Sequence, residues 1–262
     1  MGKRGIWLTI LGVVCFLGFL LFQFPAGIAI NLAESLTKDM RPQPRFFGVD
    51  GTLWHGEIKR LDVNGQHFND VKWRVHPFAL LWGNAEVNVV FRQGDNRGSA
   101  VVSKSLFGGL ALNDLKARYA AQDLVKMANI PAVKLGGMFD LSLDELVLDG
   151  NTVSGASGVL QWQRASSEFP QKVELGDIKA TLTTDKDGVK AKFSDAGGPL
   201  KISGQLLVTP KGEYKLNGSL AAREGPSSTL GRSLSMMGRA DGQGNIALNM
   251  SGKLSEFGFL FK

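Results

Sequence analysis

The chain has 262 residues, a formal net charge of +6 and a single cysteine, Cys15. Its lysines and arginines are scattered among acidic residues, without the clusters that follow nucleic-acid phosphates, so nucleic-acid binding is not expected. One cysteine excludes an intramolecular disulfide framework and a cysteine-based metal site.

The first predicted element is a transmembrane helix over residues 6–30. No charged side chain occurs in this run, and a helix of about 20 apolar residues crosses the hydrocarbon of a bilayer. A cleavable signal peptide is the alternative, because the basic residue Lys3 precedes the run and Gly27-Ile28-Ala29 is a small-x-small cleavage site. The run exceeds the roughly 7–15 residues of a signal-peptide apolar region, which favours an uncleaved anchor.

The charges beside this segment predict its orientation, because cations stay on the cytoplasmic side. Lys3 and Arg4 lie directly before the run, whereas the first cation after it is Lys38, diluted by nearby acids. We therefore expect a cytoplasmic tail at residues 1–5, a single pass through a bacterial inner membrane, and a periplasmic remainder.

Residues 31–44 are expected to form a membrane-proximal helix and linker, since Pro42 and Pro44 disfavour a helix before them. Residues 45–262 are expected to form a β-rich domain. Short runs in it alternate apolar and polar side chains, as in residues 178–183 and 189–193, with a hairpin turn predicted at Asp187-Gly188. Such two-faced strands are typical of antiparallel sheets.

The chain offers few helices to cover the apolar faces of these strands. Short helices are predicted at residues 77–82, 121–128 and 227–237, with Pro77 and a serine at position 227 or 228 as helix starts. The fold is therefore predicted to be mainly β, with an antiparallel, strongly curved sheet. The sheet either packs on another sheet as a sandwich or curls into an open groove, and the sequence leaves both alternatives open.

A short pattern recurs in the second half of the chain. Residues 201–206, 215–220 and 249–254 share the order apolar, small polar, Gly, any residue, Leu. We expect each to mark a strand with a glycine at a bend or bulge. At the end, Phe257, Phe259 and Phe261 alternate as in an edge strand, or form a docking tail.

No catalytic constellation is present in the sequence. The histidines His55, His67 and His76 lack the spacing of metal ligands, and there is no G-x-S-x-G or phosphate-binding loop. We predict that the chain is not an enzyme and that it holds no cofactor or metal.

The most distinctive stretch is residues 48–83. After the apolar N-terminal segment it presents a GTLWxG motif, then a tryptophan-arginine pair, then a proline-containing segment that ends in glycine. The residues of these motifs are Gly51, Thr52, Leu53, Trp54, Gly56, Trp73, Arg74, Pro77, Leu80, Leu81 and Gly83. In this order they resemble protein N of the bacterial type II secretion system.

The resemblance implies an accessory inner-membrane component that contributes a periplasmic protein-interaction domain to the export of folded proteins across the outer membrane. Its implied partners are other secretion-system subunits, contacted for example by sheet-edge addition. AsmA-like envelope proteins have similar GTLWxG openings, so a carrier that binds lipid in an apolar β-groove is the alternative, and a cell-wall-associated domain is a third.

The motif residues are expected to be structural. Gly51 and Gly56 would flank a short strand, and Trp73 and Trp82 would be large apolar anchors. A partner-binding role for Trp54 or Trp82 is the less favoured hypothesis.

Overall fold

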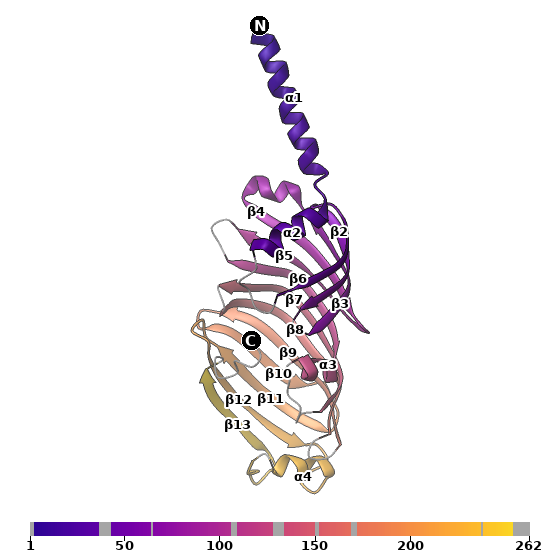
Figure 1. Cartoon of the computed structure of the whole chain (residues 1–262). Helices are drawn as coiled ribbons and strands as arrows, with labels where there is room; N and C mark the ends of the chain where they lie inside the picture. The colour runs from indigo at the N-terminus through magenta and orange to yellow at the C-terminus, as the bar shows by residue number, and fades with distance from the viewer. Residues whose placement is uncertain are drawn as a thin grey trace. The chain divides into compact units, whose positions relative to one another are not determined.

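The fold comes from a computed structural model of the chain. It describes residues 3–36, 43–63, 65–105, 109–127, 134–149, 152–168, 172–236 and 238–253. The chain divides into two compact units, Met1–Gly94 and Asp95–Lys262. Within each unit the strands form an antiparallel meander, in which every strand pairs with its neighbours along the chain (Figure 1).

Among its described residues, the first unit contains two helices, a 3-10 helix and four strands. They are α1 (Lys3–Phe22), α2 (Ala26–Leu36), β1 (Arg45–Gly51), β2 (His55–Val63), β3 (Gln66–Val75), η1 (Pro77–Trp82) and β4 (Asn84–Gln93). The β1–β2 connection is short, and Gly51 pairs with Gly56 across it. The described part of the second unit contains nine strands and two short helices. They are β5 (Asn96–Ser105), β6 (Leu110–Ala120), α3 (Ala121–Met127), β7 (Leu135–Asp149), β8 (Thr152–Ser167), β9 (Val173–Asp185), β10 (Gly188–Asp195), β11 (Leu200–Val208), β12 (Glu213–Ala222), α4 (Thr229–Ser235) and β13 (Ile246–Lys253).

The N-terminal apolar run forms two helices where the sequence predicts one. The break lies between Phe22 and Ala26, at Pro25, which lacks a backbone N–H and disfavours helical geometry at the residue before it. Pro25 instead forms an isolated β-bridge with Thr52, and Ala26 is buried. Among the described residues, no helix has both the length and the apolar character required to cross a membrane.

The predicted short helices and hairpin are confirmed. η1 has a proline in its first turn and ends at Gly83, whose φ is 74°. The N-cap of α4 is Ser228, whose Oγ accepts a 3.0 Å hydrogen bond from the Gly231 N–H. Between β9 and β10, Asp185 pairs with Gly188, whose φ is 131°.

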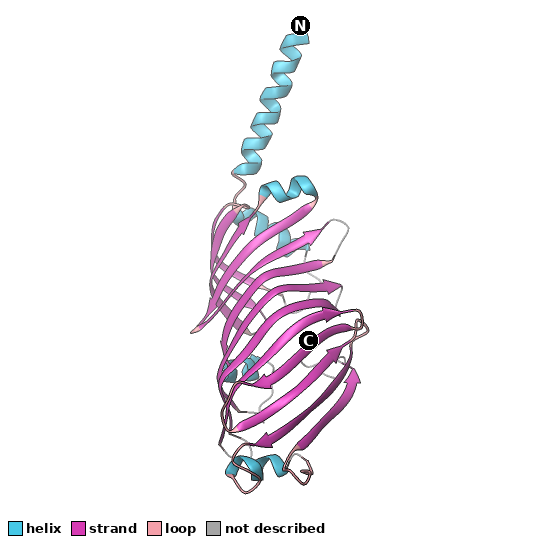
Figure 2. Ribbon diagram, turned by 180° about the vertical axis from the view of Figure 1, so that it is seen from behind, coloured by secondary structure: helices cyan, strands magenta, loops and turns pink. Residues whose placement is uncertain are grey.

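The predictions of a mainly β, antiparallel fold with few short helices are also confirmed (Figure 2). The described strands form a single open layer in each unit, with no second sheet facing it, so the sandwich alternative is not found. Two predicted segments, residues 37–42 of the linker and the Phe257, Phe259 and Phe261 strand, lie outside the described residues.

The main buried cluster of the second unit lies under α4. Leu230 and Leu234 are four residues apart on α4 and so share one helix face, which packs on β9, β11, β12 and β13. The buried members of the cluster are Val173, Leu200, Leu220, Leu230, Leu234 and Ile246. α4 therefore covers the apolar side chains at one end of this meander.

Asn96 is a buried polar residue that joins β5 to the β6–α3 junction. Its side chain is 3% exposed. Its Nδ2 donates a 2.9 Å hydrogen bond to Asp123 Oδ2, and its Oδ1 accepts a 2.8 Å bond from the Ala120 N–H. Both hydrogen-bonding ends of the amide are thus used. A substitution would remove the partner of the half-buried Ala120 N–H, and would leave the Asp123 carboxylate with Lys126 as its partner.

We expect Asn96→Ala to lower the free energy of unfolding by about 1–3 kcal/mol, because two hydrogen bonds are lost and each contributes about 0.5–1.5 kcal/mol. Urea unfolding of the full chain in detergent measures this. Asn249→Ala, at an exposed position, is the control and should change stability by less than about 0.5 kcal/mol. Equal unfolding midpoints for the two variants would contradict the role assigned to Asn96.

Candidate functional site

The β1–β2 turn holds the end of α1. Trp54 Nε1 donates a 2.9 Å hydrogen bond to the Leu21 carbonyl, and the Trp54 ring centroid lies 6.0 Å from that of Phe22. The Leu53 N–H donates a 2.9 Å bond to the Phe24 carbonyl. The last carbonyls of a helix lack hydrogen-bond partners within the helix. These bonds therefore attach the β1–β2 turn to the C-terminal end of α1 and the residues that follow it. We call this set, with Trp73 and Gly56, the N-terminal clamp.

Within the clamp, Trp73 on β3 binds the β1–β2 turn. Its Nε1 donates a 3.1 Å hydrogen bond to the Leu53 carbonyl. Gly56 makes room for the indole, because a Cβ at position 56 would lie 2.4 Å from Trp73 Cζ2 and 2.5 Å from the Asp50 carbonyl oxygen. No side chain other than that of glycine fits there without a shift of the backbone. Two residues further along β3, the Val75 N–H donates a 2.7 Å hydrogen bond to the Trp54 carbonyl.

The structure brings six of the motif residues together at or beside the clamp. They are Gly51, Thr52, Leu53, Trp54, Gly56 and Trp73. Arg74 is exposed and pairs with His55 in the β2–β3 ladder. Pro77, Leu80 and Gly83 belong to η1 and its C-cap, and the side chain of Leu81 lies outside the described set.

The expectation that Trp82 is an apolar anchor is wrong. Its side chain is 84% exposed, and that of Phe78 on the same helix is 78% exposed. The physical reason is that η1 packs against β4 while the meander is a single layer, so its outer side chains have no second layer to enter.

The second candidate surface is one face of the β5–β13 meander. Strand registers place apolar residues side by side from strand to strand. The first row crosses all nine strands and consists of Gly98, Ala117, Leu141, Leu160, Ala180, Phe193, Gly204, Gly218 and Leu248. The second row consists of Leu115, Leu143, Gly158, Leu182, Ala191, Leu206, Leu216 and Met250. We call these two rows the apolar face.

Phe193 explains two of the three glycines of the recurring sequence pattern, Gly204 and Gly218. A Cβ at Gly204 would lie 2.4 Å from Phe193 Cζ, and one at Gly218 would lie 3.1 Å from it. The phenyl ring therefore lies over this glycine pair. The β11–β12 register continues through both positions without a shift, so the expectation of a bulge there is wrong.

The opposite face of the same strands is polar. One row across it consists of Thr181, Lys192, Gln205, Asn217 and Asn249. Most residues of the apolar face are only half-buried, and Met250 is 52% exposed. α3 contacts β6 and β7, and α4 contacts β9 and β12. The described residues thus include no second sheet to shield the apolar face.

The titratable groups that the structure describes show few shifted pKa values. Burial raises the pKa of Tyr119. The hydrogen bond from Lys190 lowers the pKa of Asp185, and the hydrogen bond from the Asn245 side chain lowers that of Asp241. The two carboxylates stabilise surface turns. Among the described residues, no three His, Cys, Asp or Glu side chains are grouped to bind a metal.

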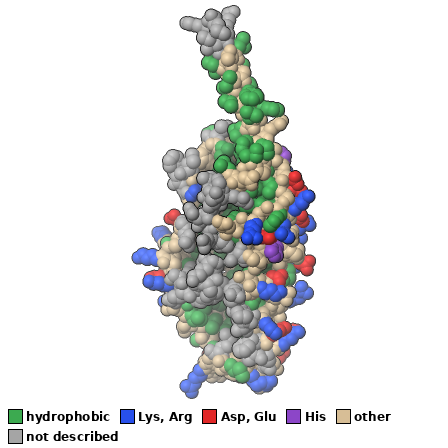
Figure 3. Space-filling view, viewed as in Figure 1, with side chains coloured by type: hydrophobic (Ala, Val, Ile, Leu, Met, Phe, Trp, Pro, Cys, Tyr) green, Lys and Arg blue, Asp and Glu red, His purple; other side chains and the backbone are tan. Residues whose placement is uncertain are grey.

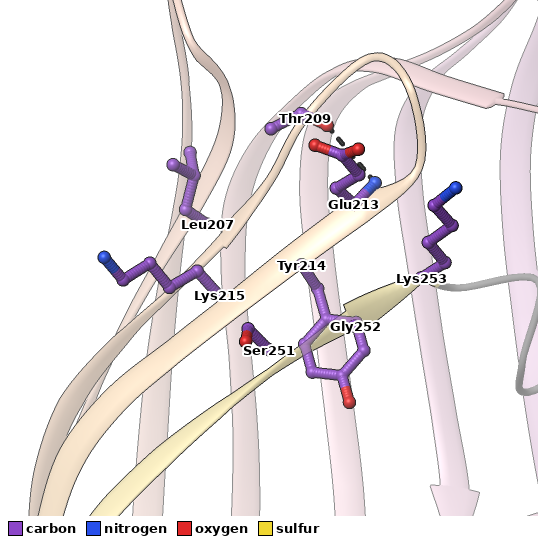
Figure 4. Close-up of a pocket in the computed structure, with 8 residues that line it drawn as sticks. All are labelled: Leu207, Thr209, Glu213, Tyr214, Lys215, Ser251, Gly252 and Lys253. Carbon is purple, nitrogen blue, oxygen red and sulfur yellow. Dashed lines mark hydrogen bonds between the residues drawn. The ribbon is translucent and has the colours of Figure 1, made fainter.

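A cavity of about 500 Å³ lies at the end of the β11–β12 hairpin (Figure 4). Its lining is Leu207, Thr209, Glu213, Tyr214, Lys215, Ser251, Gly252 and Lys253. The hairpin is closed by a 3.2 Å bond from the Glu213 N–H to Thr209 Oγ1. The lining mixes charged, polar and apolar groups without converging donors, so the N-terminal clamp and the apolar face are the stronger candidates for function.

Comparison with known proteins found a family and several relatives. The family model described as type II secretion system (T2SS), protein N, matches residues 45–249. Type II secretion system protein N of Aeromonas hydrophila is 26% identical over 260 residues, covering 96% of this chain and 100% of the relative. Its namesake from Vibrio cholerae is 24% identical, covering 87% and 93%, and that from Klebsiella pneumoniae is 27% identical, covering 97% and 98%. No solved structure matches.

Proposed function

Because this chain belongs to the type II secretion system protein N family, we propose that it is an accessory inner-membrane component of that system. Its β-rich part would lie in the periplasm and contact other subunits during the export of folded proteins. The observation that carries the proposal is the family match over residues 45–249.

The proposed anchor is the uncharged run of residues 6–30. Large apolar side chains along α1 are exposed, from Trp7 at 72% to Phe22 at 66%. In the space-filling view the coloured part of α1 carries no charged atoms (Figure 3). Such a surface is stable in hydrocarbon and unfavourable in water. The N-terminal clamp would then hold the β-strands of the first unit close to the membrane.

A gene deletion tests the role in secretion. We expect cells without the gene to retain folded exoproteins in the periplasm, and a plasmid copy of the full chain to restore their release into the medium. A second copy, in which a cleavable signal peptide replaces residues 1–25, tests the anchor and should restore less. Normal release from the deletion strain would contradict the secretion role.

The apolar face favours one second candidate, a carrier that binds lipid acyl chains. Two uninterrupted apolar rows on a single-layer sheet offer a surface on which such chains could lie. A photo-crosslinking residue at Met250, with Asn249 on the polar face as the control, separates the two candidates in cells. A lipid mass on the adduct at position 250 supports the carrier, and a protein adduct supports the secretion-subunit contact.

A further inference from the structure

η1 is an exposed, uncharged element. Its sequence is PFALLW, and of the large apolar side chains in the described residues Trp82 and Phe78 are the most exposed. Leu80 is 47% exposed as well. One other exposed aromatic residue of the same unit, Phe47, is less exposed, at 43%. Phe47 lies under the Arg60 guanidinium, 4.4 Å from the ring centroid. Neither the N-terminal clamp nor the apolar face includes the two aromatic residues of η1.

The position of η1 is tied to the end of α1. The Val75 N–H bonds to the Trp54 carbonyl at 2.7 Å, and the Trp54 indole bonds to the Leu21 carbonyl at 2.9 Å. Val75 lies two residues before Pro77, the first residue of η1. Two successive hydrogen bonds thus join the start of η1 to the last turn of α1. In Figure 1 the purple helix next to the β4 label, which the colour bar places near residue 80, lies at the end of the first unit where α1 leaves.

We propose that η1 is a second membrane contact, in which Phe78 and Trp82 insert into the interface between headgroups and acyl chains next to the point where α1 leaves the bilayer. This inference rests on the anchor proposed above. We choose lipid as the partner of η1 for two reasons. The exposed apolar surface of α1 is favourable in lipid, and η1 is attached to the end of α1. An element with no charge and two exposed aromatic rings has the composition that interfaces favour.

The chemistry of the two side chains fits this location. A tryptophan at an interface buries its rings among acyl chains while Nε1–H donates to a headgroup or ester oxygen. The Phe78 ring brings no polar group that would have to be dehydrated. With α1 as a first attachment and η1 as a second, the first unit could no longer rotate freely about the axis of α1. The contact would therefore orient the β-strands of this unit relative to the membrane plane.

Depth-dependent fluorescence quenching tests the proposal with the full chain. The protein is reconstituted into vesicles of phosphatidylethanolamine and phosphatidylglycerol, with a nitrobenzoxadiazole label on one cysteine at a time. The native Cys15 reports on α1. Phe78→Cys in a Cys15→Ser background reports on η1. Met236→Cys in the same background is the matched control, because Met236 is 76% exposed but lies just after α4, in the second unit.

We expect lipids with a shallow nitroxide to quench the label at position 78 and lipids with a deep nitroxide to quench the label at Cys15. The label at position 236 should be quenched by neither. If the label at position 78 stays unquenched while that at Cys15 is quenched, the η1 contact is overturned and the anchor stands. If Cys15 stays unquenched, the anchor is overturned, and the label at position 78 then decides the η1 contact by itself. Equal quenching at positions 78 and 236 would also overturn the proposal, since it would reflect unspecific adsorption.

Discussion

Replacing Gly56 with alanine is expected to destabilise the first unit by about 3 kcal/mol, at the upper end of the usual effect of overpacking. The new Cβ would lie 2.4 Å from Trp73 Cζ2 and 2.5 Å from the Asp50 carbonyl oxygen. The indole could rotate away only by giving up its bond to Leu53, and the backbone oxygen belongs to the paired strand β1. Urea unfolding of the full chain in detergent, followed by tryptophan fluorescence, measures the loss.

Gly27→Ala is the control for this variant. A Cβ at Gly27 would meet no atom within 4 Å, and alanine is preferred over glycine in a helix by up to about 1 kcal/mol. We expect this variant to be as stable as the parent or more stable. An unchanged unfolding midpoint for Gly56→Ala would show that Gly56 does not fill the position assigned to it in the clamp.

Replacing Met250 with glutamate is expected to abolish most of the secretion activity without unfolding the chain. Met250 is 52% exposed on the apolar face, so the carboxylate remains solvated in the free protein. When an apolar partner or acyl chain covers that face, the charge loses its water. An unpaired buried charge costs about 3–5 kcal/mol, and 3 kcal/mol alone is on the order of a hundredfold in affinity. Release of exoproteins by a complemented deletion strain is the measurement.

Asn249→Glu adds the same charge one residue earlier, at a position that is also exposed but lies on the polar face. It should complement like the parent, and both variants should unfold at the same urea concentration as the parent. Equal secretion by the two variants would rule out the apolar face as the contact surface.

The alternation of side chains made most of the sheet predictable. Residues 178–183 and 189–193 alternate because each strand has one apolar and one polar face, and the hairpin between them follows from the conformational freedom of Gly188. The helices η1, α3 and α4 were predictable from local signals, such as the proline that begins the first of them. These features depend on contacts within a few residues.

The candidate surfaces were less predictable because they depend on contacts between distant residues. The bond from Trp54 to Leu21 joins positions 33 residues apart, and nothing in GTLWxG specifies that partner. Likewise, Gly204 and Gly218 become neighbours through strand register, and the ring that requires them comes from a third strand. The break at Pro25 did have a local signal, which is the proline itself. The uncharged run over residues 6–30 instead favoured the prediction of one continuous helix.

Trp82 shows a different limit. Large aromatic side chains are usually buried, so a tryptophan beside strands is expected to enter the core. That expectation assumes a second layer of structure, and the described strands form one layer. The composition of η1 fits a buried segment and a membrane-interface segment equally well. Only its place beside the end of α1 favours the membrane interface.

The order of the strands also bears on how the chain reaches its folded state. In each meander every strand pairs with its immediate predecessor, so most contacts join residues close in sequence and the contact order is low, which favours rapid folding. A chain that crosses a membrane in the unfolded state, N-terminus first, could add strands one at a time as they emerge. Each new strand would then find its pairing partner already in place, because that partner is the strand before it in the sequence. Val173 and Leu200 would be the exception, because the helix that covers them, α4, would emerge almost last.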